Sequence, residues 1–154
     1  MLGKPITEDC SFLLENQAHI IGDNIYFSPL FHLKMTENPF KLEERQYPID
    51  FVYPREDKYF MNISIPEGYQ LISKPEDLNM AMIDNLAGFV YRITIQGQQL
   101  QVMASFKINQ AIIAADQYAQ LKEFFKNAIE KQTEKVVLSK IGNDGTKNSP
   151  TKGR

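Results

Sequence analysis

Residues 88–108 form two alternating runs of apolar and polar positions, joined by a single turn signal. Gly97 and Gln98 lie between the runs, and a two-residue loop with Gly in its first position is typical of a type II′ β-hairpin turn. With this turn, the pairs on one face are all apolar or small: Ile95 with Leu100, Ile93 with Val102, Tyr91 with Ala104, and Phe89 with Phe106. A one-residue slip would turn this face to water, so the pattern predicts a single register.

Shorter strands are predicted on both sides of this hairpin, separated by Gly, Pro, Asn and Asp. They are expected within residues 11–21, 24–30, 49–53, 58–65, 69–72, 79–83 and 134–141. In the first of these, Phe12, Leu14, Ala18 and Ile20 form the apolar set. Residues 32–45 are expected to be a loop. Strands that recur every 10 to 15 residues with turns between them favour a sandwich or barrel over βαβ units.

One segment has the period of a helix. Between Asp116 and Gln132, apolar residues recur three or four positions apart and form one stripe, with Lys and Glu on the remaining positions. Asp116 is the expected cap at the start of the helix. The fold class predicted from these patterns is a mainly β, antiparallel domain with one C-terminal amphipathic helix. Residues 9–141 are expected to be one domain, between a flexible lead (1–8) and a flexible polar tail (142–154).

Size and charge narrow the classes of function. A chain of 154 residues is long enough for one domain that buries roughly two-thirds of its unfolded surface. Lys and Arg total 17 against 19 Asp and Glu, which leaves no basic stripe of the kind that binds nucleic acid. No apolar run reaches the roughly 18 residues of a membrane span, and residues 1–20 lack the pattern of an export signal. The sequence therefore indicates a soluble chain without a nucleic-acid partner.

Candidate catalytic and metal-binding groups are few. Cys10 with His19 or His32 is a conceivable thiol nucleophile and base, but no helix start or Gly-rich loop surrounds Cys10 to lower its pKa. The more ordinary interpretation is a small apolar Cys and a surface histidine at position 19. No metal-binding spacing is present. The adjacent carboxylates in the loops are expected to be solvated charge, so no cofactor and no metal are predicted.

Aromatic residues are the least ordinary feature of the composition. The chain has seven Tyr and ten Phe but no Trp, and Tyr47, Tyr53 and Tyr59 lie within one third of it. Such residues either fill the core between sheets or line a face that binds carbohydrate or peptide. We favour the core interpretation and keep a stand-alone carbohydrate- or peptide-binding domain as the alternative function.

Residues 38–51, which read NPFKLEERQYPIDF, are similar to the signature of a C-terminal domain of unknown function in bacterial transglutaminase-like, cysteine peptidase-like proteins. Three later pieces agree in order and type: the turn at 65–69, the helix start at 118–125 and the segment 134–138. The resemblance covers about residues 24–140. The signature residues are Asn38, Pro39, Phe40, Arg45 and Pro48.

The resemblance implies an immunoglobulin-like β-sandwich that accompanies a catalytic core in a secreted or periplasmic parent protein. In that family the Cys-His-Asp machinery belongs to the preceding core, so no catalytic residue is carried over to this chain. The implied function is a non-catalytic accessory domain that packs against the core or presents substrate to it. The signature also has a structural explanation, in which prolines restrict a charged loop, Phe40 plugs the end of the sandwich, and Arg45 pairs with a carboxylate such as Asp50.

Overall fold

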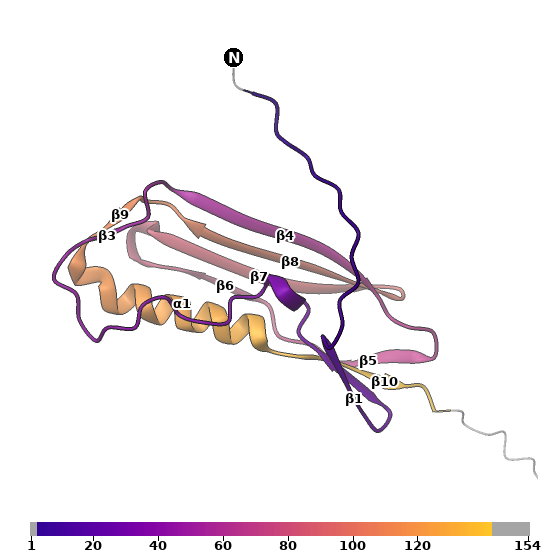
Figure 1. Cartoon of the computed structure of the whole chain (residues 1–154). Helices are drawn as coiled ribbons and strands as arrows, with labels where there is room; N and C mark the ends of the chain where they lie inside the picture. Colours follow the sequence, from indigo (N-terminus) through magenta and orange to yellow (C-terminus); the bar gives the residue numbers. More distant parts are fainter. Residues whose placement is uncertain (1–2, 143–154) are drawn as a thin grey trace, which may run out of the picture.

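A computed structural model describes residues 3–142, which form antiparallel sheets and one long helix (Figure 1). The strands are β1 (Ala18–Ile21), β2 (Asn24–Phe27), β3 (Ile49–Asp50), β4 (Arg55–Ser64), β5 (Tyr69–Ser73), β6 (Leu78–Ala81), β7 (Ala87–Gln96), β8 (Gln99–Ile108), β9 (Ile112–Ile113) and β10 (Val136–Lys140). Helix α1 spans Tyr118–Thr133, and short 3-10 turns lie at Phe31–Leu33, Ile83–Asn85 and Ala115–Gln117. The mainly β class with one C-terminal helix is as predicted. Most of the expected tail, residues 143–154, and the first two residues of the expected lead lie outside the described residues.

The predicted hairpin is the centre of a four-stranded sheet with the order β4-β8-β7-β6. Its register is the predicted one, because Gln96 faces Gln99 and Phe89 faces Phe106. Gly97 has a φ of 60°, which the first position of a type II′ turn requires. We call this sheet the main sheet. Its inner face carries the largest buried side chains, including Tyr91, Phe89 and Ile93.

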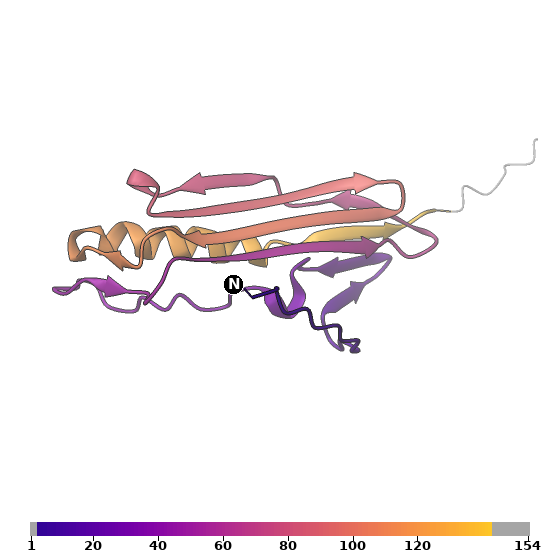
Figure 2. The ribbon, with the colours of Figure 1, turned by 90° about the horizontal axis from the view of Figure 1, so that it is seen from above.

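The second layer covers the inner face of the main sheet with two kinds of element. Helix α1 covers one part of that face, and the sheet β1-β2-β10-β5 lies beside the helix along the length of the molecule (Figures 1 and 2). Phe124 and Phe125 of the helix contact Phe106 of β8, with ring centroids 5.6 and 4.9 Å apart. One continuous hydrophobic core therefore joins the helix and both large sheets.

The N-terminal prediction was wrong in part. Only Ala18–Ile21 is a strand, and it pairs with β2, whereas residues 3–15 have no strand partner among the described residues. Phe12 and Leu14 remain 61% and 40% exposed. Asn16, with a φ of 59°, interrupts the extended path. An alternating pattern therefore gave no strand where no neighbouring strand was in place to bond the backbone.

Two smaller predictions also need correction. The cap of helix α1 is not Asp116, which lies inside the preceding 3-10 turn; the capping position is Gln117, and it makes no side-chain cap bond. The strand expected at 49–53 ends at Asp50. The Asp50 carboxylate accepts a hydrogen bond from the Val52 N–H (2.7 Å), and Val52 has a φ of 71°, so the chain turns there.

Candidate functional site

The signature segment is fastened to helix α1. The Asn38 side chain donates a hydrogen bond from Nδ2 to the Lys122 carbonyl (2.8 Å) and accepts one at Oδ1 from the Phe40 N–H (2.9 Å). Phe40 is buried, and its ring meets Phe125 edge-on at a centroid distance of 4.9 Å and Tyr118 at 5.7 Å. Asn38 thus aims Phe40 into the core beside the helix.

The segment continues along the helix after Phe40. The Leu42 carbonyl accepts hydrogen bonds from the Tyr118 hydroxyl (3.0 Å) and from Lys122 Nζ (2.9 Å). Pro39 and Pro48 are both exposed. Their restricted backbone angles bracket the segment without adding buried contacts. The contacts of this segment are structural in kind, since none of them builds a reactive group.

Arg45 does not make the ion pair that we expected. Its side chain is exposed, and among the described residues it forms no salt bridge with Asp50 or with any other carboxylate. Asp50 instead accepts the local hydrogen bond from Val52. A short carboxylate that is satisfied two residues along the chain has no need of the arginine.

The candidate thiol and imidazole groups lie on separate exposed segments. Cys10 is exposed in the extended N-terminal segment, and the ring of His32 packs edge-on against Phe12 at a centroid distance of 5.3 Å. His19 lies in β1 opposite Tyr26, and it is exposed as predicted. Within residues 3–142, no three His, Cys, Asp or Glu side chains gather as metal ligands would. No helix in this range is long and apolar enough to cross a membrane.

Most aromatic side chains serve the core, including Phe40, Phe89, Tyr91, Phe106 and Tyr118. Of the three clustered tyrosines, Tyr47 and Tyr53 are 76% and 62% exposed, whereas Tyr59 is half-buried against the core. The Tyr91 hydroxyl is buried without a hydrogen-bond partner among the described residues. Burial raises the pKa of Tyr91 well above its ordinary value, and the Glu134 carboxylate acts in the same direction.

Four large apolar side chains near the N-terminal end of the chain are exposed. Phe12, Leu13, Ile20 and Ile21 are 61%, 85%, 71% and 66% exposed, and we call them the N-terminal apolar residues. Ile20 and Ile21 follow one another in β1, so they point to opposite sides of that strand. The segment that carries the first two extends away from β1 (Figure 1). A groove of about 300 Å³ opens beside β1 and is lined by apolar residues of both sheets, among them Ile20, Phe27, Ile63 and Leu138. Apolar surface of this kind is typical of a protein contact.

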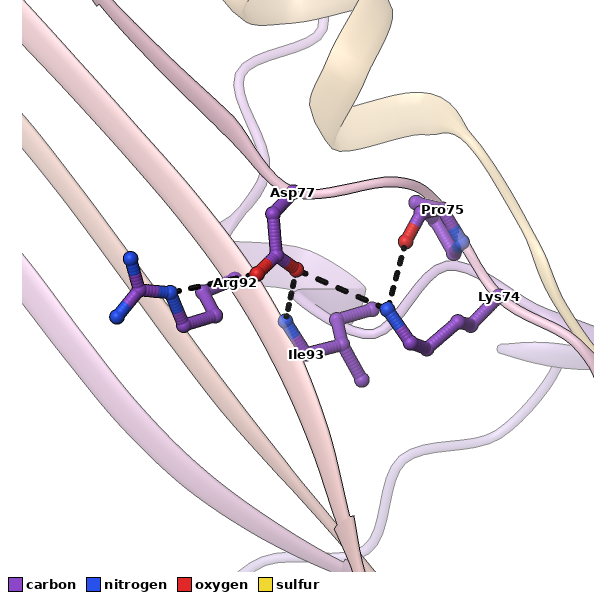
Figure 3. Close-up of polar contacts among 5 residues, drawn as sticks. All are labelled: Lys74, Pro75, Asp77, Arg92 and Ile93. Atoms are coloured by element: carbon purple, nitrogen blue, oxygen red, sulfur yellow. Dashed lines mark hydrogen bonds and ion pairs between the residues drawn. The ribbon is translucent and has the colours of Figure 1, made fainter.

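The Asp77 carboxylate binds a backbone N–H near one edge of the main sheet (Figure 3). The pairing of β6 with β7 stops at Tyr91. The next N–H of β7 that points toward the β6 side is that of Ile93, and it has no strand to bond to. Asp77 Oδ1 accepts that hydrogen bond (3.2 Å), and Asp77 Oδ2 pairs with Arg92 Nε (3.3 Å). Lys74 Nζ lies 3.7 Å from Oδ1 of the same carboxylate. Asp77 thus takes the place of a neighbouring strand and holds the Arg92 side chain.

The outer face of the main sheet carries a shallow hollow of about 400 Å³. Its lining includes Phe60, Asn62, Arg92, Thr94, Gln101 and Met103. Phe60 is 74% exposed and lies opposite Met103 in the register, which in turn lies opposite Arg92. The terminal nitrogens of Arg92 point away from Asp77 (Figure 3). The hollow therefore offers an aromatic ring, a guanidinium and uncharged hydrogen-bonding groups to a ligand.

Charge on this outer face is mostly paired. Lys58 pairs with Glu56 (3.0 Å) and Arg92 with Asp77 (3.3 Å), whereas Lys107 forms no salt bridge among residues 3–142. Hydrogen bonds from Lys58 and Ser105 lower the pKa of Glu56, which keeps that carboxylate ionised. The alternation along β4 and β7 explains why Phe60, Arg92 and Thr94 lie on the outer face. The role of Asp77 was missed, because it depends on where β6 begins.

The geometry defines a small mainly β domain whose candidate sites are contact surfaces. Residues 23–138 match the model of DUF3858, described as a domain of unknown function with a solved structure. The chain belongs to this family, and the matched range agrees with the range of the resemblance found in the sequence.

A solved structure shares the fold. It is the crystal structure of a putative protease from Parabacteroides distasonis, with a TM-score of 0.54 and 11% sequence identity. The match covers 64% of this chain and 19% of that protein. The matched part of this chain thus spans about a fifth of the length of that protein. No curated protein matches the chain at a significant level.

Proposed function

We propose that this chain is a non-catalytic accessory domain that packs against the catalytic core of a larger transglutaminase-like, cysteine peptidase-like protein. The observation that carries the proposal is the exposure of the N-terminal apolar residues, whose four large side chains are each more than 60% exposed. Burying such side chains against a partner is favourable, at roughly 25 cal/mol per Å² of apolar surface. A second domain of the same protein is the partner that best fits.

The comparisons support this proposal in two ways. The family match is to a domain rather than to a whole enzyme, and the structural neighbour is about five times longer than the region it shares with this chain. The sequence signature adds the resemblance to transglutaminase-like proteins. On this proposal the two layers are a divergent immunoglobulin-like sandwich in which α1 replaces part of one sheet, and the parent protein is secreted or periplasmic.

The experiment is a binding measurement between this chain and a separately expressed catalytic core from the parent protein. We expect Leu13→Asp combined with Ile20→Asp to weaken binding by at least about tenfold, which corresponds to about 1.4 kcal/mol. Stability of the chain alone should stay within about 0.5 kcal/mol, because both side chains are already exposed. Ile72→Asp on β5, where the side chain is 58% exposed, is the matched control and should bind normally.

Two results would count against the accessory role. One is a parent gene that encodes no catalytic core. The other is a core that binds the double variant as tightly as the unchanged chain.

A further inference from the structure

Strand β4 is an open edge of the main sheet whose outward-facing backbone groups can be assigned. The Ile65 N–H donates to the Gln98 carbonyl (2.8 Å), in continuation of the β4–β8 register. In an antiparallel ladder the bonding residues alternate, so Met61 and Ile63 also bond to β8. Phe60 and Asn62 therefore direct their N–H and C=O groups away from the sheet. The topology places no strand beyond β4 among residues 3–142.

The two edges of the main sheet differ in protection. On the other side, the edge strand β6 is only four residues long, and Asp77, flanked by Lys74 and Arg92, occupies the stretch of β7 that β6 does not reach. Natural proteins block exposed strand edges with charged side chains of this kind. On β4, charged residues occupy positions 55–58, but none lies between Tyr59 and Ser64. The unguarded half of β4 is also the half that carries the exposed Phe60.

The hollow and the charge of the outer face adjoin this unguarded edge. Phe60 and Asn62 line the hollow together with Arg92, and Lys107 adds positive charge on the same face, whereas Lys58 is paired with Glu56 (3.0 Å). A strand added to β4 would place alternate side chains over this face. Acidic side chains of a peptide complement Lys107 and the terminal nitrogens of Arg92, which form no ion pair among residues 3–142.

From this juxtaposition we infer that the β4 edge between Phe60 and Ser64 binds an extended peptide with acidic side chains, as an added antiparallel or parallel strand. Main-chain hydrogen bonds to Phe60 and Asn62 hold the peptide, and Arg92 and Phe60 select its side chains. Asp77 fixes Arg92 through Nε and leaves the terminal nitrogens free for a carboxylate. The inference concerns a different surface from the N-terminal apolar residues and does not depend on the accessory role.

The test measures binding of a capped synthetic peptide, Ser-Glu-Val-Glu-Val-Glu-Ser, to the 154-residue chain by calorimetry. Asn62→Pro removes one outward N–H without removing a bond to β8, and it should weaken binding by about tenfold or more. Asn79→Pro is the matched control. By the same alternation from the Met82 N–H to Ala87 carbonyl bond, Asn79 faces outward on β6, so that change should leave binding within about twofold.

Charge selection is tested with Arg92→Gln and with a Gln version of the peptide. We expect the unchanged chain to prefer the Glu peptide by at least about fivefold, and Arg92→Gln to lose most of that preference. Arg55→Gln, which removes another exposed arginine paired with a carboxylate (3.9 Å to Asp57), should keep it. If Asn62→Pro does not fold, NMR of the unchanged chain replaces that variant as the test. The amide signals of Phe60, Asn62 and Ser64 must then shift when the peptide is added.

Several outcomes overturn the inference. They are no binding of the Glu peptide, equal binding of a Lys version, and equal weakening by Asn62→Pro and Asn79→Pro. Concentration-dependent dimerisation that Asn62→Pro abolishes would assign the edge to a second copy of the chain instead. None of these results bears on whether the N-terminal apolar residues bind a catalytic core.

Discussion

Replacing Phe40 with alanine tests whether the signature segment is a structural fastening. Phe40 is only 8% exposed, and its ring meets Phe125, Tyr118 and Phe51 at centroid distances of 4.9, 5.7 and 6.3 Å. Truncating a buried Phe to Ala removes its transfer free energy and leaves a cavity, at a cost of about 3–5 kcal/mol. We take about 3.5 kcal/mol, because the site lies at one end of the core and can partly collapse.

The assay is urea and thermal unfolding of the isolated chain, followed by circular dichroism. For a chain of this size, each kcal/mol lowers Tm by about 2–4 °C, so Phe40→Ala should lower Tm by about 10 °C. Phe60→Ala is the control, since Phe60 is 74% exposed and its removal should change stability by less than about 0.5 kcal/mol. A loss below about 1 kcal/mol for Phe40→Ala would refute the structural explanation and leave the signature to be explained by binding.

Two further changes follow from individual contacts. Tyr91→Phe removes a buried hydroxyl with no partner among the described residues, so it should leave the free energy of unfolding unchanged or raise it by up to about 1 kcal/mol in urea unfolding. The pKa of Tyr91 is raised in the folded state, so the contribution of Tyr91 to the free energy of unfolding is constant below the unfolded pKa of about 10. Above that pH the contribution falls, by at most about 1.4 kcal/mol per pH unit. The difference in stability between the unchanged chain and Tyr91→Phe should therefore shift with pH only above about 10, and a difference that is already pH-dependent near 8 would contradict the assignment. Arg45→Ala should leave Tm within about 2 °C, because Arg45 is exposed and unpaired within residues 3–142; a larger fall would mean that it has a structural partner after all.

The parts of the fold that the sequence predicted well are the parts governed by local rules. A period of two on either side of Gly97 and Gln98 was enough to determine every pair of the central hairpin, from Gln96 with Gln99 to Phe89 with Phe106. The helix followed equally from its apolar stripe, of which Leu121 and Phe125 are buried. In both cases neighbouring residues in the sequence decide the structure.

The features that the sequence did not predict depend on partners distant in the chain. The order β1-β2-β10-β5 places β10 between strands from the first half of the chain, and no local pattern specifies that. Phe12 and Leu14 have a strand-like alternation but no neighbouring strand among the described residues. Asp77 acquires its role only because β6 begins at Leu78, opposite Tyr91, and so does not reach Ile93 of β7.

The accessory role is tested most directly by hydrogen exchange at residues 11–21, compared between the isolated chain and the chain in the presence of its catalytic core. In the isolated chain the amides of residues 11–15 should exchange rapidly, because the described structure gives them no strand partner. We predict that the core slows exchange across Phe12, Leu13 and β1, while the β5 strand on the opposite edge of its sheet is unaffected. Equal exchange rates at Phe12 and Leu13 with and without the core would contradict the proposal.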